Sequence, residues 1–458
     1  MTEHLIWDPL MVQRYNRAGP RYTSYPTAIE FCTASDDANQ RRALSQSTSR
    51  PLSLYLHIPF CSHVCYYCGC NKIVTRNKDR AEPYLQWLLQ EIDLKAALVR
   101  QDRVVEQLHL GGGTPTFFSD EQLDRLITHL RRRFRFSDAD SADFSIEIDP
   151  RELGPETLST LRALGFNRVS FGVQDLDPDV QKAVNRIQSQ EMIHQVMSEA
   201  RALGFRSINV DLIYGLPLQT LDSFERTIRD IIDLRPDRLS VFNYAHLPQR
   251  FMPQRRINAE DLPAPEEKLT IFGMAIRSLS ESGYHYVGMD HFALPDDELS
   301  LAQAKGTLHR NFQGYTTHGN CDLIGFGVSS ISQLGDLFIQ SPVELDAWQT
   351  ELARGRLPTA RECRSSREDE IRKRIIMGLL CHLSVRFNDL DEEFGINSRD
   401  RFSAELARLQ GMQEDGLLII DSEGIQVTDA GRLLVRQACM AFDAYRTESE
   451  QPRFSRAI

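Results

Sequence analysis

Four cysteines are crowded into the ten-residue segment CSHVCYYCGC, with the spacing Cys-x3-Cys-x2-Cys-x-Cys. They are Cys61, Cys65, Cys68 and Cys70. Zinc sites usually use two separated cysteine pairs that enclose one tetrahedral ion. Three thiolates in one short loop can instead bind three corners of a [4Fe–4S] cube. A cube with three protein ligands leaves one iron open to the amine and carboxylate of a substrate or cofactor.

We predict that Cys61, Cys65 and Cys68 bind this cluster, with Cys70 beside them, because Cys68 and Cys70 are too close in sequence to reach opposite corners easily. If Cys70 were a fourth ligand, no iron of the cluster would be open to a substrate or cofactor, and the cluster could only transfer electrons. A zinc site or reduced structural thiols are the remaining interpretations. The total of nine cysteines is odd, which excludes a fully paired disulfide framework within the chain.

A glycine triplet follows the second predicted strand directly, in GGGTP at Gly111–Pro115. Three glycines let a ligand approach the backbone, whose N–H and C=O groups can hold a carboxylate or an ammonium group. The segment lacks the Lys-Ser/Thr of a Walker loop and the GxGxxG of a dinucleotide fingerprint. Alone it is more often a tight turn, but one strand after the cysteine loop it indicates a binding site.

Polar residues stand at the carboxyl ends of four later strands. A charged or amide group in an otherwise apolar strand is costly to bury without a partner. A core salt bridge explains one such residue, whereas recurrence at four strand ends indicates a common polar site. The residues are Glu147, Asp149, Gln174, Asp175, Arg186, Asp211, Tyr244, Ala245 and His246.

Short apolar segments alternate with helical patterns from Leu52 onward, which predicts an α/β fold with a parallel sheet, open or closed into a barrel. The segment RALGF occurs twice, 39 residues apart, and each copy predicts a helix that ends at glycine before a strand. The predicted strands are Leu52–Ile58, Val104–Leu110, Phe144–Ile148, Arg168–Val173, Ser207–Tyr214 and Arg238–Tyr244. Predicted helices include Ala81–Val99 and Asp120–Phe134.

The alternation of strand and helix patterns ends near Ser282, and residues 284–340 are predicted to form loops and short strands. From Arg361 the composition favours helices, at Asp369–Leu383, Arg399–Gln410 and Asp429–Tyr445, with a hairpin over Gly416–Val427. Helices followed by a hairpin resemble a winged helix. We predict an N-terminal arm (1–50), a central α/β domain (51–350) and a C-terminal helical domain (361–458) that serves packing or as a lid rather than DNA binding.

The overall composition is that of a globular protein of 458 residues, 41% hydrophobic and 26% charged. With 53 Lys plus Arg against 64 Asp plus Glu, the net charge is −11, which argues against broad binding of nucleic acid. The N-terminus has no apolar signal region. Residues 51–71 lack Asp, Glu, Lys and Arg, but their histidines, proline and cysteines favour a strand and loop over a membrane span. We expect a cytoplasmic protein without membrane contact.

The motifs together resemble the radical S-adenosylmethionine (SAM) enzymes and, within them, the family of oxygen-independent coproporphyrinogen III oxidases. The resemblance covers nearly the whole chain. Related haem-chaperone-like members usually lack the fourth cysteine and the N-terminal arm, whereas this chain has Cys70 and YTSYPT at Tyr22–Thr27. The matching segments are GPRYTSYPTA, LYLHIPFCSHVCYYCGCNK, GGGTPT, SIEIDPRE, GVQD, VNR, DLIYGLP, FNYAHLP, HRNFQGY and RFSRAI.

This resemblance implies a partial (β/α)6 radical SAM barrel with an N-terminal arm and a mainly helical, winged-helix-like C-terminal domain. It implies two bound SAM molecules beside the cluster, and roles near the substrate for Tyr55, His57 and Cys70. The first SAM would contact Tyr55, Gly112, Glu147 and Ile331. The second SAM would contact Tyr67, Gly113, Thr114, Gln174, Arg186, Asp211 and Ala245.

The implied reaction is the anaerobic oxidative decarboxylation of two propionate side chains of coproporphyrinogen III to vinyl groups, which gives protoporphyrinogen IX in haem biosynthesis. The implied partners are this substrate and a reducing donor such as flavodoxin or ferredoxin, and we expect a monomer. An anionic substrate needs a cationic pocket, for which Arg21 and Arg310 are candidates. The alternatives are another radical SAM tetrapyrrole enzyme, a haem-trafficking protein, or a non-catalytic iron–sulfur or zinc protein that binds DNA.

Overall fold

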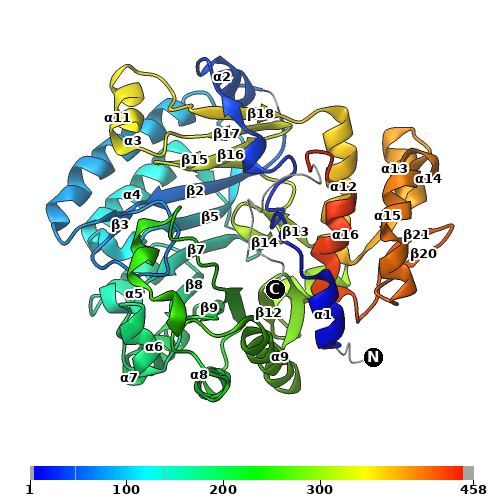
Figure 1. Ribbon diagram of the computed structural model, residues 1–458. Helices are drawn as coiled ribbons and strands as arrows, with labels where there is room; N and C mark the ends of the chain where they lie inside the picture. Colours follow the sequence, from blue (N-terminus) through cyan, green and yellow to red (C-terminus); the bar gives the residue numbers. More distant parts are fainter. Residues whose placement is uncertain (1–4, 47, 139, 447–458) are drawn as a thin grey trace.

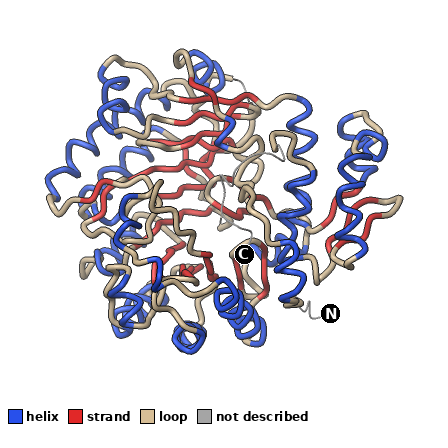
Figure 2. The backbone as a smooth tube through the Cα atoms, in the orientation of Figure 1, coloured by secondary structure: helices blue, strands red, loops and turns tan. Residues whose placement is uncertain are grey.

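A computed structural model describes residues 5–46, 48–138 and 140–446. The closing segment RFSRAI, which contributes to the resemblance, lies outside these ranges. Most of the described chain wraps around one curved sheet, with helices along its outer side (Figure 2). No described helix combines the length and apolar character needed to cross a bilayer.

The sheet has 14 strands in its described part, and it remains open. Its centre consists of seven adjacent parallel strands, in the order β15-β2-β5-β7-β8-β9-β10. They are β2 (Leu52–Ile58), β5 (Val104–Gly112), β7 (Asp143–Ile148), β8 (Arg168–Gln174), β9 (Ser207–Tyr214), β10 (Arg238–Asn243) and β15 (Asp322–Phe326). The six predicted strands are confirmed, and the resulting fold is a partial, unclosed barrel.

Antiparallel strands extend both edges of this parallel centre. On one side lie β16 (Ile331–Leu334), β17 (Leu337–Gln340), β18 (Arg361–Arg364) and β1 (Cys32–Thr33). On the other side lie β12 (His291–Ala293) and β11 (His285–Gly288). The short strand β6 (Arg135–Phe136) instead pairs in parallel with the central strand β5. The short strands β3 (Phe60–Cys61) and β4 (Ile73–Val74) pair apart from this sheet, as do β13 (His309–Asn311) and β14 (Gly314–Thr316).

The central strands alternate between buried apolar residues and partly exposed polar residues such as Tyr55, His109 and Asp211. In β2, every residue except Tyr55 is buried. Figure 1 shows the helices of the repeating units along the outer side of the sheet. They are α3 (Ala81–Ala96), α4 (Asp120–Arg133), α5 (Thr157–Ala163), α6 (Pro178–Ala183), α7 (Gln190–Ala202), α8 (Leu221–Leu234) and α9 (Pro265–Glu281).

Local signals set the ends of these helices. Ser119 caps α4, with a reciprocal bond from the side chain of Gln122, as a capping box requires. The glycines of the two RALGF copies, Gly165 and Gly204, follow α5 and α7 with φ of +98° and +75°. Such φ values favour glycine, so the predicted helix ends are confirmed.

The C-terminal elements lie on the inner side of the sheet (Figure 1). They are α12 (Arg367–His382), α13 (Phe387–Phe394), α14 (Ser398–Arg401), α15 (Ser403–Glu414), α16 (Val435–Ala441) and the strands β19 (Ser384–Arg386), β20 (Leu418–Ile420) and β21 (Gly424–Val427). The predicted hairpin is β20–β21, which β19 extends to three strands. The single helix predicted over Arg399–Gln410 is wrong, because it breaks at the buried Phe402 into α14 and α15.

The remaining helices are α1 (Pro9–Tyr15), α2 (Ala38–Leu44), α10 (Glu298–Ala304) and α11 (Leu345–Ala353). The prediction of one helix over Asp429–Tyr445 is also wrong, because its start is a turn and a 3-10 segment, Arg432–Leu434, before α16. The N-terminal helix α1 packs beside the C-terminal region, where Arg14 pairs with Asp415. The first and last parts of the described chain therefore meet at the inner side of the sheet.

Candidate active site

The cysteine loop leaves the carboxyl end of β2, at the edge where parallel α/β sheets bind their ligands. Two bonds fix it from a neighbouring segment: Asn185 Nδ2 donates to the Val64 carbonyl at 2.7 Å, and the Tyr66 amide donates to the Val184 carbonyl at 2.9 Å. Because Val184, Asn185 and Arg186 form the motif VNR, this motif positions the loop as well as its own side chains.

Donors surround two of the sulfur atoms predicted to bind iron. Thr114 Oγ1 lies 3.6 Å from Cys61 Sγ, while Arg186 Nη1 and Arg151 Nη2 lie 3.4 Å and 3.6 Å from Cys65 Sγ. Donors and positive charge of this kind stabilise sulfur ligands and tune an iron–sulfur cluster. Among the described residues, no three His, Cys, Asp or Glu side chains form a group that could hold a metal ion.

Cys68 and Cys70 are hydrogen-bonded to each other and differ in acidity. The bond from Cys70, aided by Lys72, lowers the pKa of Cys68 to about 5, although burial opposes this shift. The same bond and burial hold the pKa of Cys70 well above its usual value. Lys72 Nζ also donates to the Cys68 carbonyl at 3.0 Å. The bond from Cys70 and the charge of Lys72 therefore favour the thiolate form of Cys68 over that of Cys70.

A cavity of about 530 Å³ opens beside the cysteine loop. Tyr55 and His57 line it from β2, and Tyr55 Oη lies 3.0 Å from His57 Nδ1. His57 Nε2 lies 3.0 Å from the Asn71 carbonyl, which can only accept, so Nε2 carries the proton and Nδ1 accepts from Tyr55. Burial lowers the pKa of His57 and favours the neutral ring. The other predicted residues in the lining are Cys70, Gly112, Glu147 and Ile331.

His109 is a lining residue that the sequence analysis missed. It lies beside Tyr55 and Ser145 in the register of β2, β5 and β7, and its ring stacks on Tyr55 with centroids 5.8 Å apart. Its Nδ1 bonds to Ser145 Oγ at 2.8 Å, and its Nε2 lies 3.4 Å from Glu147 Oε1. The sequence did offer a signal for this residue, because His109 is a polar residue in a predicted strand and stands two positions before the glycine triplet.

Glu147 points to the same cavity and also accepts from the Gly112 amide at 3.1 Å. Burial raises the pKa of this carboxyl, but the bond from His109, the charge of that histidine and the Gly112 amide outweigh burial and leave the pKa below its usual value. Glu147 is therefore an anionic acceptor, suited to the hydroxyls of a nucleoside.

The glycine triplet packs tightly against the end of β2. The amides of Gly113 and Thr114 donate to the carbonyls of Ile58 and Phe60, each at 2.8 Å. A Cβ at Gly113 would lie 2.7 Å from the Pro59 carbonyl, and Gly112 has φ of +118°. These glycines are needed to dock the loop on β2, and the amides expected to be free for a ligand are used inside the protein.

A second group of predicted residues gathers around Arg186. Its guanidinium bonds to Asp149 Oδ2 at 3.0 Å and to the Gly172 carbonyl. Tyr67 also lies near this guanidinium, which is buried and takes its counter-charge from Asp149. Gln174 has φ of +70°, a costly conformation that often marks functional residues. In the described part of the chain, Gln174 Oε1 and Arg186 Nε are buried without a hydrogen-bond partner, as expected beside a polar ligand.

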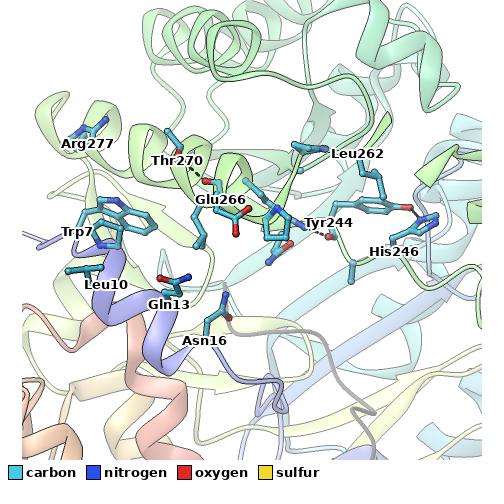
Figure 3. Close-up of a pocket in the computed structure, with 18 of the residues that line it drawn as sticks. Trp7, Leu10, Gln13, Asn16, Tyr244, His246, Leu262, Glu266, Thr270 and Arg277 are labelled. Atoms are coloured by element: carbon cyan, nitrogen blue, oxygen red, sulfur yellow. Dashed lines mark hydrogen bonds between the residues drawn. The ribbon is translucent and has the colours of Figure 1, made fainter. Parts of the chain in front are cut away.

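Gln254, also missed from sequence, joins the cysteine loop to the end of β10. Its Nε2 donates to the carbonyls of Tyr67 and Ala245, at 2.9 Å and 3.2 Å. Ala245 lines a separate cavity of about 810 Å³ between α1, the end of β10 and the start of α9. Figure 3 shows Trp7, just before α1, and Leu10 and Gln13 of α1 along one side of this cavity, with Tyr244 and His246 at one end.

Asp211 on β9 accepts from Ser170 Oγ at 3.0 Å and from Asn209 Nδ2 at 2.8 Å. Burial and the nearby Glu147 raise the pKa of Asp211 to about 6. The unfolded chain loses this proton near its usual pKa of about 4. Between about pH 4 and pH 6 the unfolded chain loses this proton while the folded protein still holds it. The free energy of unfolding therefore falls as the pH rises through this range.

Replacing Asp211 by asparagine is expected to stabilise the ligand-free protein above pH 6, by up to about 3 kcal/mol, because the neutral amide avoids this cost. The gain should vanish below about pH 4.5, where the native carboxyl is protonated. The measurement is the free energy of unfolding of both proteins across this pH range. An equal difference at every pH would contradict the assignment.

The chain is similar in sequence and in structure to known proteins. The model of the Radical SAM superfamily matches residues 55–231, and the model of the HemN C-terminal domain matches residues 365–434. Over its full length the chain is 52% identical to the oxygen-independent coproporphyrinogen III oxidase of Pseudomonas aeruginosa and 48% identical to that of Escherichia coli, covering 100% of each.

The solved structure of coproporphyrinogen III oxidase (HemN) from Escherichia coli, described as a radical SAM enzyme, superposes with a TM-score of 0.92 at 47% identity. The match covers 96% of this chain and 100% of the solved one. The expected fold is thereby confirmed along the chain. From these full-length similarities, the chain belongs to the oxygen-independent coproporphyrinogen III oxidases of the radical SAM superfamily.

Proposed function

We propose that this protein converts coproporphyrinogen III to protoporphyrinogen IX without oxygen, by oxidative decarboxylation of two propionate side chains to vinyl groups. The observation that carries this function is the loop of Cys61, Cys65 and Cys68 beside a cavity lined by Tyr55, His57, Cys70 and Glu147, in a chain similar over its full length to enzymes of this name. Its place is in haem biosynthesis.

The cofactors are a [4Fe–4S] cluster and SAM, which together supply a radical able to remove a hydrogen atom from an unactivated carbon. Cys61, Cys65 and Cys68 would hold the cluster, and the bonds of Arg151 and Arg186 to Cys65 support this role. Arg186 also orders the loop through its pairing with Asp149, which Arg151 shares at 2.7 Å.

Two groups of side chains would hold two SAM molecules. Tyr55, Gly112, Glu147 and Ile331 line one cavity and would bind the first, with Glu147 as acceptor for nucleoside hydroxyls. The other group would bind the second molecule, and the unpartnered Gln174 Oε1 and Arg186 Nε support that assignment. This group comprises Tyr67, Gly113, Thr114, Gln174, Arg186, Asp211 and Ala245.

Tyr55, His57 and Cys70 would act near the substrate. The neutral His57 accepts from Tyr55 at Nδ1 and donates from Nε2 to the Asn71 carbonyl, so it fixes the direction of the Tyr55 hydroxyl. The hydrogen bond and the charge of Cys68 hold the pKa of Cys70 above its usual value. Cys70 would then face the substrate from the lining of the cavity rather than bind the cluster.

The protein would work as a monomer in a reducing cytoplasm, with electrons from flavodoxin or ferredoxin. Electrons would enter at the cysteine loop, where the His63 side chain is 41% exposed and pairs with Glu152. We assign different roles to the arm (1–50), the central domain (51–350) and the C-terminal domain (361–458). The central domain would carry the cofactors, and the other two would cover the substrate.

The test is product analysis under anaerobic conditions. The reconstituted, reduced protein is incubated with SAM and coproporphyrinogen III, and tetrapyrroles are separated after oxidation. Formation of the divinyl product together with 5′-deoxyadenosine is expected. A methylated tetrapyrrole, or no change in the tetrapyrrole, would contradict the proposed function.

A further inference from the structure

A group of cations that the site described above does not use lies near the carboxyl ends of β9 and β10 and the amino end of β12. It comprises Arg21, Arg310 and Arg436, and we call it the arginine cluster. Each residue comes from a different region: the N-terminal arm, the strand β13 and the helix α16. Because the three arginines come from regions far apart in the sequence, the fold of the whole chain sets their positions.

Asp290 and His291 connect the members of the arginine cluster. Arg21 forms an ion pair with Asp290, which is 7% exposed. Arg310 lies over the ring of Tyr315, 4.7 Å from its centroid, and the same ring packs edge-on against His291 at 5.4 Å. Arg436 interacts electrostatically with both Arg21 and Asp290. Arg21 thus pairs with Asp290, Arg436 lies near both, and Arg310 reaches the neighbouring His291 through the ring of Tyr315.

This arrangement leaves positive charge and hydrogen-bond donors unused. Arg436 is only 3% exposed, yet within the described ranges its Nε and Nη2 have no hydrogen-bond partner. The same is true of Arg310 Nε and Nη1. A buried guanidinium without partners is costly. Burial and the charge of Arg21 lower the pKa of Arg436 to about 10, which still leaves it protonated at neutral pH.

The arginine cluster adjoins open space beside the cofactor site. Arg310 lines a cavity of about 750 Å³, while Phe312 and Gln313, which connect β13 to β14, line the cavity that holds Tyr55 and Glu147. On the other side, Arg21 packs over Phe242, and the next residue, Asn243, lines the cavity of Figure 3. The cavity lined by Arg310 and the cavity that holds Tyr55 and Glu147 share the lining residue Leu323, so the two adjoin.

We propose that Arg310 and Arg436, together with Arg21, bind a carboxylate of the tetrapyrrole substrate, with Arg436 as the buried donor that completes the site. The proposal rests on the proposed function, whose substrate carries four propionates. Guanidinium groups match carboxylates in geometry and charge. The methionine part of SAM carries the same chemical group, and the experiment separates the two sources.

The test compares binding of two ligands to the reconstituted protein: coproporphyrin III, the stable oxidised form of the substrate, and SAM. Loss of charged hydrogen bonds in Arg436→Met and in Arg310→Gln is expected to weaken coproporphyrin III binding about 10- to 100-fold, with SAM binding unchanged. The matched control is Arg432→Met. Arg432 is 4% exposed, lies one helical turn earlier and donates to the Tyr286 carbonyl at 2.7 Å.

Thermal stability supplies a second readout that a merely structural arginine would not give. Without ligand, Arg436→Met should melt at or above the wild-type temperature, because it removes a buried cation that has unpartnered donors and is repelled by Arg21. Arg432→Met should melt lower but bind coproporphyrin III normally. A fall in SAM binding with unchanged coproporphyrin III binding, or no change in either, would overturn the inference.

Failure of this inference can be told from failure of the proposed function. If the wild type turns over coproporphyrinogen III and Arg436→Met binds coproporphyrin III as tightly, only the carboxylate site is refuted. If the wild type neither binds the porphyrin nor converts the porphyrinogen, both are refuted.

Discussion

Replacement of Cys65 by alanine is expected to abolish both the bound iron and the activity. Cys65 is the middle ligand of the predicted set, 8% exposed, and its sulfur accepts from Arg151 and Arg186. Without it, two ligands remain, and the two guanidinium groups face each other with less negative charge between them. Iron and sulfide content and the brown colour of the reconstituted protein should fall to background.

Two other cysteines supply the controls for this experiment. Cys439 is fully buried in α16 and bonds weakly to the Ile376 carbonyl, so Cys439→Ala should keep the full iron content. Cys70→Ala should also keep the cluster, but lose activity, because Cys70 faces the cavity with Tyr55 and His57. A Cys65→Ala protein with full iron content would refute the ligand set, and a Cys70→Ala protein without iron would restore Cys70 as a fourth ligand.

Replacement of Lys95 by methionine is expected to cause a large loss of stability. Lys95 and Glu91 of α3 form an ion pair of 2.7 Å in which both side chains are 0% exposed. Lys95 also donates to the Gly325 carbonyl, while Glu91 accepts from the Gly327 amide and from Trp348 Nε1. Removing the lysine leaves a buried carboxylate without its counter-charge, which costs about 3–5 kcal/mol.

The measurement is the free energy of unfolding of the cluster-free protein in denaturant. The matched control is Lys305→Met, because Lys305 is exposed at the end of α10 and its replacement should change stability by less than about 0.5 kcal/mol. Adding Glu91→Gln to Lys95→Met should recover part of the loss, since it removes the unpaired charge. Equal stability of Lys95→Met and wild type would show that the pair does not secure α3 to β15.

The parallel centre of the fold could be predicted because its signals are local. Each of the six strands is a short apolar segment next to a helical pattern, and the two RALGF glycines mark helix ends. The seventh parallel strand, β15, could not be recognised, because Asp322–Phe326 is short and joins the sheet through long-range parallel pairing with β2. The antiparallel edge strands follow from similar long-range pairing.

The candidate site was predictable where residue types recur at fixed spacing, as in the cysteine loop. His109 and Gln254 escaped because each acts through a position that only the folded chain reveals. His109 meets Tyr55 and Ser145 through strand register, and Gln254 spans two loops from a 3-10 segment. Arg436 escaped for a similar reason, since its isolation from partners is a property of burial.

The most direct test of the central claim follows a hydrogen atom. Coproporphyrinogen III with deuterium on its propionate β-carbons is incubated anaerobically with the reduced protein and SAM, and 5′-deoxyadenosine is analysed by mass spectrometry. The account predicts that deuterium appears in 5′-deoxyadenosine and that vinyl groups form in step with it. Vinyl formation with unlabelled 5′-deoxyadenosine, or cleavage of SAM without any vinyl product, would contradict it.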